Sequence, residues 1–218
     1  FRSVVLLDIM GTLVHDPFFD EFPSYFNLTF KELLSVKHPE SWLRFERGEI
    51  DAAAFCEKFW AEEHAASQPP VSADGLLSHV RAHYRYLEGA ERVLARLKAT
   101  EGLGTHALSN YPVWYQAIEE ELVLSKYLEW SFVSCHMGVR KPDARAYTIP
   151  TERLGVSASD AIFVDDALAN VEAARAVGMA AIHFTGDWDA AEAELESWLK
   201  GRGVTLSPPA ADASVTAT

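Results

Sequence analysis

Residues 4–13, VVLLDIMGTL, decide the fold that the rest of the chain has to complete. Four consecutive apolar residues are typical of a short strand that is buried on both faces. This strand brings Asp8 to its carboxyl end, where Gly11 allows a tight turn and Thr12 adds a hydroxyl group. In an open parallel sheet, ligands bind at the carboxyl ends of the strands. Asp8 is therefore a candidate nucleophile or metal ligand, provided that other strand ends bring matching groups.

Three later segments bring such groups in order. Two of them are short strand-like runs, residues 105–108 and 161–164, and the third is a loop, residues 138–143. The polar side chains that they supply are Ser109, Asn110, Lys141, Asp165 and Asp166. Each segment alone is common, because Lys-Pro and Asp-Asp pairs often begin helices. Together and in this order, they predict one site at one edge of a parallel sheet.

Three carboxylates, those of Asp8, Asp165 and Asp166, would converge at this edge. Like charges do not lie close together in a dry site unless a cation neutralises them. A few hard oxygen ligands suit Mg²⁺, which keeps water ligands and accepts a substrate phosphate. Lys141 offsets further charge, and Ser109 supplies a hydrogen bond to a phosphoryl group. The alternative is that the aspartate pair merely caps the following helix, which leaves Asp8 and Lys141 without a role.

This ordered pattern resembles the haloacid dehalogenase (HAD) superfamily of hydrolases, from Val4 to about Phe184. The resemblance implies an α/β fold, with a Rossmann-like parallel sheet core and a helical C1-type cap inserted after the first strand. The patterning agrees, because strand and helix signals alternate from Gly89 onward. We expect a core of residues 1–16 and 88–202 and a cap of residues 17–87. Residues 203–218, rich in Ser, Thr, Pro and Ala, are expected to be a flexible tail.

The expected cap shows helical patterning and no convincing strand. Thr29 and Glu32 form a capping-box pattern at the start of one helix. Asp51 is a plausible N-cap for a second helix. That helix carries Phe55, Cys56, Phe59 and Trp60 at helical spacing, and we expect it to run until residues 67–70, SQPP, interrupt it.

The resemblance also implies a catalytic, metal-binding or substrate-binding role for each of these residues. Asp8 attacks phosphorus to give an aspartyl-phosphate, which water then hydrolyses. Mg²⁺ takes a carboxylate oxygen of Asp8, the main-chain carbonyl of Met10 and a carboxylate oxygen of Asp166. Asp165 holds metal-bound water or pairs with Lys141. The residues expected to bind the substrate are Thr12, Asn110, Phe18, Phe19 and Tyr111.

Met10 departs from the usual phosphatase pattern. Phosphatases of the superfamily carry aspartate two residues after the nucleophile, as a general acid and base. A thioether cannot transfer protons, and acid–base help contributes about 10²–10⁴-fold to a rate. A slow enzyme is therefore compatible with Met10. A water molecule, His15 or a cap residue could replace the acid, and loss of catalysis in favour of a binding or assembly role with a protein partner is the alternative.

Other branches of the superfamily also lack this acid. Dehalogenases replace it with tyrosine and need no metal, so the intact aspartate pair makes this alternative less favoured. Phosphonate-cleaving members use a cap lysine as a Schiff base. The cap lysines here are Lys31, Lys37 and Lys58, all in plausible surface positions.

A more specific resemblance is to the plant chloroplast FMN hydrolases of this superfamily, which also carry Met at the position of Met10. It rests on residues 8–19, 33–39 and 110–115. It implies hydrolysis of FMN to riboflavin and phosphate, and a location in the chloroplast stroma, with the cytoplasm as the alternative. The chain begins at Phe1, which would fit removal of a targeting segment.

A flavin would explain the aromatic residues near the catalytic segments. Aromatic stacking adds about 0.5–1.5 kcal/mol beyond area burial. Phe18, Phe19 and Tyr111 are the candidates for contact with its rings. The remaining aromatic residues of the cap are expected to pack in the core, namely Trp42, Phe55, Phe59 and Trp60.

Composition limits the classes of partner. The net charge of −13 argues against a nucleic-acid surface or an anionic membrane face, since both need clustered Lys and Arg. No apolar run reaches the length of a membrane span. Cys56 and Cys135 are too few for a disulfide framework and fit no zinc motif. The expected ligand is a small phosphorylated molecule.

Overall fold

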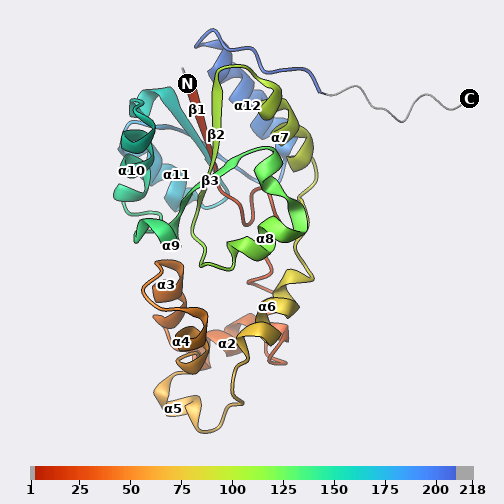
Figure 1. The fold of residues 1–218 in the computed structure, drawn as a ribbon, viewed down its shortest axis with the longest axis vertical. Coiled ribbons are helices and arrows are strands. Elements are labelled where there is room, and N and C mark those ends of the chain that lie inside the picture. Colours follow the sequence, from red (N-terminus) through yellow and green to blue (C-terminus); the bar gives the residue numbers. More distant parts are fainter. Residues whose placement is uncertain (1–2, 210–218) are drawn as a thin grey trace, which may run out of the picture.

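The computed structural model describes residues 3–209, and the part of the expected tail at residues 210–218 lies outside them. Its centre is a five-stranded, fully parallel sheet (Figure 1). The strands lie in the order β3-β2-β1-β4-β5. Their bounds are Ser3–Leu7 for β1, Leu103–Ser109 for β2, Glu129–Val133 for β3, Ala161–Asp165 for β4 and Ala180–His183 for β5. The predicted α/β fold with a parallel sheet is confirmed.

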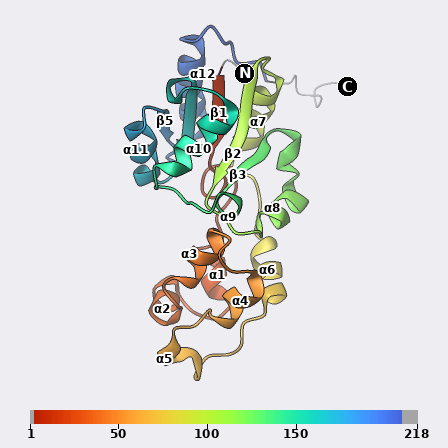
Figure 2. The ribbon, with the colours of Figure 1, turned by 60° about the vertical axis from the view of Figure 1, so that its left-hand side comes forward.

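Side-chain alternation along β1 divides the core into two layers. Val4 and Leu6 face one layer, whereas Val5 and Leu7 face the other. Helices cover both faces, so the central strand is fully buried (Figure 1). Helices α10 (Arg145–Leu154) and α11 (Leu168–Ala176) contribute to the first layer, and α7 (Ala90–Ala99) and α12 (Trp188–Lys200) to the second. The shorter helices α8 (Tyr115–Leu122) and α9 (Ser134–Met137) lie near the carboxyl ends of the strands (Figure 2).

Six short helices between β1 and α7 form a separate helical lobe beyond the carboxyl ends of the strands (Figures 1 and 2). They are α1 (Glu21–Ser24), α2 (Phe30–Val36), α3 (Ser41–Glu46), α4 (Ala52–Glu57), α5 (Glu62–Ala65) and α6 (Ala73–Arg81). The capping box at Thr29 and the N-cap at Asp51 are both present. The apolar residues of the lobe join the second core layer, so the lobe and the sheet pack as one body.

Helix α4, which begins after the N-cap Asp51, is shorter than its sequence pattern predicts. It ends at Glu57, before Phe59 and Trp60, and α5 covers only residues 62–65. The backbone of residues 59–61 pairs with residues 36–38 instead, through bonds from His38 N to Phe59 O and from Ala61 N to Val36 O. Helical spacing of the apolar side chains did not reveal this pairing, because it depends on a distant segment.

The chain after α12 remains packed for several residues. Leu206 is buried, and Ser207 hydrogen-bonds with Thr100 and with the carbonyl of Ala99. The packed part of the chain therefore extends beyond residue 202, where the tail was expected to begin. Cys56 and Cys135 are both free thiols. Within residues 3–209, no helix has the length and apolar character needed to cross a bilayer.

Candidate active site

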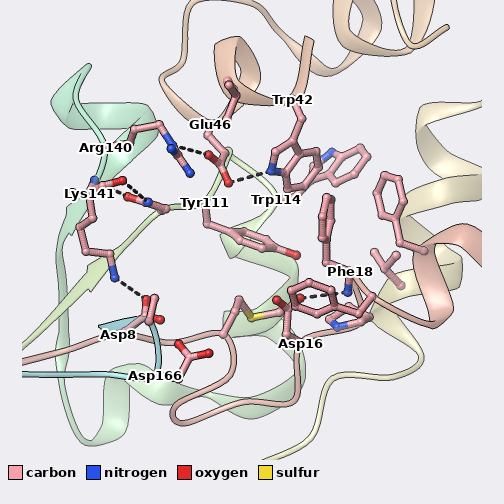
Figure 3. Close-up of a pocket in the computed structure, with 18 of the residues that line it drawn as sticks. Asp8, Asp16, Phe18, Trp42, Glu46, Tyr111, Trp114, Arg140, Lys141 and Asp166 are labelled. Carbon is pink, nitrogen blue, oxygen red and sulfur yellow. Dashed lines mark hydrogen bonds and ion pairs between the residues drawn. The ribbon is translucent and has the colours of Figure 1, made fainter. Parts of the chain in front are cut away.

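The ammonium group of Lys141 bridges two carboxylates at the strand ends. Its Nζ atom lies 2.7 Å from Oδ1 of Asp8 and 2.6 Å from Oδ2 of Asp165 (Figure 3 draws the Asp8 contact). Strands β1 and β4 are neighbours in the sheet, so their carboxyl ends bring the two aspartates together. All three side chains are buried. A buried charged triad of this kind is costly unless each charge is paired, and here Lys141 pairs with both carboxylates.

The protonation of this triad follows from its burial and charges. Burial raises the pKa of Asp8 to about 8, although Lys141 opposes this and Asp165 adds to it. Burial lowers the pKa of Lys141, but the charges of Asp8 and Asp165 and its hydrogen bonds to them outweigh this, so its pKa is raised. Lys141 is therefore the cation that opposes protonation of Asp8. One ammonium group does not balance all the carboxylates at this edge.

Asp165 has little capacity left for a further ligand. Its Oδ1 accepts hydrogen bonds from Ala167 N (2.7 Å) and Asn170 Nδ2 (3.1 Å). Its Oδ2 accepts from Lys141 Nζ (2.6 Å) and again from Asn170 Nδ2 (3.0 Å). A carboxylate offers about four acceptor sites. Asp165 therefore fixes Lys141 rather than presenting a free oxygen.

Asp166 is held differently. It is exposed, and its main-chain N–H donates to Thr12 Oγ1 at 3.1 Å, while its carboxylate makes only a long 3.5 Å contact to that hydroxyl. Gly11, at φ +78°, lies so close that a Cβ atom there would come within 2.5 Å of Asp166 Oδ2. Glycine is thus needed both for the left-handed backbone and for the approach of this carboxylate.

The donor set fits a small divalent cation. Asp8, Asp165 and Asp166 each place an oxygen within 4.8 Å of the others. Although much of Asp166 is exposed, partial burial of its carboxylate raises its pKa, and the charge of Asp165 adds to this, so the cluster has too much negative charge for one lysine. Because Asp165 is occupied by hydrogen bonds, Asp8 and Asp166 are the side chains with oxygens available. Hard oxygen donors with a carbonyl nearby are typical of Mg²⁺.

A cavity of about 410 Å³ extends from this cluster into the helical lobe. Figure 3 shows Asp8, Asp166 and Lys141 at one end and Phe18 and Trp42 at the other. Phe18 packs against Trp42 at a centroid distance of 5.5 Å, and Trp42 contacts Tyr111 at 6.1 Å. The volume is within the usual range of about 300–1,000 Å³ for ligand pockets. The site therefore combines an anionic centre with an aromatic wall.

Four charged residues line the cavity away from the carboxylate cluster: Asp16, Lys37, Glu46 and Arg140. Glu46 is buried, and accepts hydrogen bonds from Trp42 Nε1 (2.7 Å) and Arg140 Nε (2.8 Å) (Figure 3). This joins α3 of the lobe to the residue beside Lys141. Lys37 forms no ion pair with any residue that the structure describes, and donates only a long 3.4 Å hydrogen bond to the carbonyl of His38.

Burial lowers the pKa of Lys37, so its environment is poorer in water than that of a surface lysine. The expectation that all three cap lysines lie at the surface is therefore wrong for Lys37, which lines the cavity. It holds for Lys31 and Lys58, which are exposed.

The structure also shows which of the expected substrate-binding residues reach the cavity. Phe18, Phe19, Asn110 and Tyr111 line it, as does Met10. Thr12 and Ser109 are not among the described residues that line it. Both are buried, and Thr12 contacts Asp166 instead. Placement at a strand end therefore did not ensure access to the ligand.

Asn110 lines the cavity, but its amide is already engaged. Its Nδ2 donates to the carbonyl of Lys141 at 2.9 Å, and its Oδ1 accepts from the N–H of Lys141 at 2.8 Å. Asn110 therefore holds the loop that carries the lysine.

Sequence reasoning missed several cavity residues. Asp16 lies within residues 8–19, which carry the more specific resemblance, and Arg140 directly precedes Lys141, so their positions were available as signals. Lys37 and Glu46 carried no signal that distinguishes them from surface charges. Trp42 was expected to pack in the core, and it lines the cavity as well as joining the aromatic cluster of the lobe.

His15, a sequence candidate for the general acid, is paired with a residue of the lobe. Its Nε2 lies 2.9 Å from Glu21 Oε1, and it is not among the described residues that line the cavity.

Comparison with known proteins agrees with this geometry. Residues 3–178 match the family model described as haloacid dehalogenase-like hydrolase. The chain is 39% identical to the flavin mononucleotide hydrolase 1 of Arabidopsis thaliana, named as chloroplast-located, over 83% of this chain and 71% of that protein. It is 29% identical to the sesquiterpene phosphatase AstK of Aspergillus oryzae, over 72% of this chain and 79% of that protein.

Solved structures show the same fold. A HAD family enzyme from Bacteroides thetaiotaomicron, in complex with magnesium and inorganic phosphate, superposes with a TM-score of 0.70 at 18% identity. The match covers 88% of this chain and 99% of that one. The L-2-haloacid dehalogenase of Xanthobacter autotrophicus gives a TM-score of 0.61 at 19% identity, over 97% and 92% of the two chains.

Proposed function

This chain is a phosphatase of the haloacid dehalogenase-like hydrolase family, and we propose that it hydrolyses FMN to riboflavin and phosphate through an aspartyl-phosphate on Asp8. One observation carries the proposal: a single cavity joins the Asp8–Lys141 pair to an aromatic wall. A phosphate ester with a flat aromatic ring system matches both ends of this cavity. The related plant enzyme is named for such a substrate.

The chain's own residues supply positioning and charge. Asp8 attacks phosphorus in line with the ester oxygen, and Lys141 holds its carboxylate in place and neutralises part of the phosphoryl charge. Asp165 and Asn110 fix the lysine from its side chain and its main chain, respectively. Phosphoryl transfer depends mainly on such positioning and electrostatic stabilisation. In the second half of the reaction, water attacks the aspartyl-phosphate, releases phosphate and restores Asp8.

Asp8, Asp166 and the main-chain carbonyl of Met10 would hold Mg²⁺, and Asp165 would support the site by holding Lys141. When bound, the ion neutralises the carboxylates and the phosphate oxygens. Met10 does not impair this role, because its ligand atom belongs to the main chain. Gly11 supports the same site by leaving room for the carboxylate of Asp166.

The distal end of the cavity would recognise the ring system. Phe18 and Trp42 present aromatic faces. Lys37, with no ion-pair partner among the described residues, has donors available for an electronegative edge. The pyrimidine part of isoalloxazine has such an edge in its carbonyl oxygens. A buried charged donor rejects ligands that leave it unpaired, so Lys37 would favour flavin over purely apolar rings.

The test is release of both products from FMN. Purified protein would be incubated with FMN and Mg²⁺, and riboflavin and phosphate measured together, with Asp8→Asn as the matched control. We expect equal amounts of the two products, inhibition by EDTA and no turnover by the variant. Turnover by a folded Asp8→Asn protein would contradict the nucleophile. Tight binding of FMN without turnover by the parent would support the alternative of a binding subunit.

The domain organisation and location are proposed on the same grounds. The helical lobe of residues 17–87 would act as the cap over a core of residues 1–16 and 88–202. A location in the chloroplast stroma is supported by the name of the plant relative.

A further inference from the structure

The reaction proposed above needs a proton for its leaving group, and Met10 cannot supply one. A ribityl alkoxide is a poor leaving group. Five of the described residues that line the cavity have a side chain that can act as an acid. Asp8, Asp16, Glu46 and Asp166 carry carboxyl groups, and Tyr111 carries a phenol. Asp8 and Asp166 belong to the phosphate end, and Glu46 is paired with Arg140. Asp16 is the remaining carboxyl group.

Asp16 lies between the two ends of the cavity that the proposed substrate would span. It follows the first catalytic turn by a few residues, and Phe18 N donates to its Oδ1 at 2.9 Å. In Figure 3 it lies between Asp166 and Phe18, that is, between the phosphate end and the aromatic wall. The hydrogen bond from Phe18 holds one oxygen and leaves Oδ2 without a hydrogen bond from any described residue. A substrate that spans the cavity therefore passes this carboxyl group.

The surroundings of Asp16 favour its protonated form. Burial raises its pKa to about 6, the hydrogen bond from Phe18 opposes this, and the charge of Asp166 adds to it. The other titratable groups that act on it or respond to it are His15, Glu21, Tyr84 and Tyr111. A general acid works best with a pKa near the operating pH.

The two tyrosines are poorer candidates. Their hydroxyls are hydrogen-bonded to each other at 2.9 Å, and burial raises the pKa of Tyr84 to about 12 and that of Tyr111 well above its usual range. They would hold their protons too tightly to exchange them near neutral pH.

We propose that Asp16 is the general acid and base of this phosphatase, in place of the aspartate that Met10 has displaced. The inference rests on the proposed phosphoryl transfer to Asp8. In the first step the P–O ester bond breaks as the bond from Asp8 to phosphorus forms, and the Asp16 carboxyl proton passes to the leaving oxygen. In the second step Asp16 carboxylate takes a proton from the attacking water, phosphate leaves, and both aspartates return to their starting states.

The test compares Asp16→Asn with the parent on phosphate esters of increasing leaving-group pKa, from a nitrophenyl ester to FMN and a simple alkyl ester. Asparagine keeps an oxygen for the bond from Phe18 but has no proton to transfer. We expect kcat on FMN and the alkyl ester to fall by about 10²–10⁴-fold, with a much smaller effect on the nitrophenyl ester. Asp20→Asn is the matched control, because Asp20 is exposed on the same segment and makes no side-chain capping bond.

The pH profile gives a second measure. A limb near pH 6 in the parent's alkyl-ester activity should disappear in Asp16→Asn. Adding Met10→Asp to Asp16→Asn should restore part of the lost alkyl-ester activity, because it returns a proton donor to the cavity. A folded Asp16→Asn protein with a raised KM for FMN and an unchanged dependence on leaving-group pKa would show that Asp16 only holds the substrate, and would overturn the inference.

Failure of the two proposals is distinguishable. If the parent hydrolyses none of the esters, the proposed function fails and this inference falls with it. If the parent hydrolyses them and Asp16→Asn does so equally well, only the role of Asp16 is wrong.

Discussion

The side-chain amide of Asn110 makes two hydrogen bonds with the main chain of Lys141, one to its carbonyl (2.9 Å) and one from its N–H (2.8 Å). The end of β2 thereby fixes the loop that carries Lys141. The lysine has no other anchor of this kind on its main chain among the hydrogen bonds of residues 3–209. Its precise placement against Asp8 is therefore a property of Asn110 as much as of the loop.

We predict that Asn110→Ala lowers kcat more than it changes KM. Loss of both bonds frees the loop, and displacement of a catalytic group by about 1 Å can cost about 10²-fold in rate. Steady-state kinetics on FMN, with thermal unfolding to confirm the fold, would measure this. An unchanged kcat in a folded variant would show that the loop keeps its position without Asn110.

We predict that Lys141→Met destabilises the protein in a pH-dependent way. Removing the cation leaves Asp8 and Asp165 as buried, unpaired charges, at a cost of about 3–5 kcal/mol in the free energy of unfolding. The folded-state pKa of Asp8 is already raised to about 8, and loss of Lys141 raises it further. A carboxyl group with a raised folded-state pKa stabilises the fold at low pH, and this stability is lost as the pH rises through that pKa.

The deficit of Lys141→Met should therefore grow as the pH rises. Urea unfolding of parent and variant at about pH 5 and about pH 9, without divalent cations, measures it. A deficit that is equal at both pH values would contradict the assignment of the lysine as the partner of these carboxylates.

We predict that Lys37→Met raises KM for FMN and leaves activity on a nitrophenyl ester unchanged. A hydrogen bond from a charged donor contributes about 1.5–3 kcal/mol, so the rise in KM should be about 10- to 100-fold. Lys31→Met is the matched control, since Lys31 is exposed on the neighbouring α2. Equal effects on both substrates would place Lys37 outside ring recognition.

We predict that Met10→Asp, added to Asp16→Asn, speeds the hydrolysis of esters with poor leaving groups by up to roughly 10²–10⁴-fold relative to Asp16→Asn alone, whereas in the parent, where Asp16 already supplies the proton, the gain is small. Two effects oppose the gain: a further carboxylate near Asp8 adds like-charge repulsion, and an apolar contact to the ligand is lost. The measurement is therefore the slope of rate against leaving-group pKa. A slope as steep as that of Asp16→Asn alone would mean that residue 10 does not face the leaving group.

Local signals explain most of the correct expectations. The apolar runs before Asp8 and Asp165 predicted buried parallel strands, and the sheet confirms them. Because parallel strands end at the same edge, their order along the chain was enough to place these two aspartates near Lys141. The capping box at Thr29 was also visible, since both of its partners lie within one helical turn.

Expectations that depended on the direction in which a side chain points were less reliable. Thr12 and Ser109 follow the predicted strand ends, yet neither is among the described residues that line the cavity. Strand-end position does not state which way a side chain points after the turn. Lys37 was expected at the surface, because the antiparallel bridge between Lys37 and Trp60 that positions it is not visible in the local pattern.

The sequence by itself therefore determined the α/β class, the parallel sheet and the set of charged residues at its edge. These follow from hydrophobic periodicity and from strand ends, which act over a few residues. Only the tertiary structure decided that Asp165 and Asn110 hold Lys141, and that Lys37, Glu46 and Asp16 line the cavity. Those relationships join segments far apart in the chain, and their energies depend on burial and distance, which no local pattern encodes.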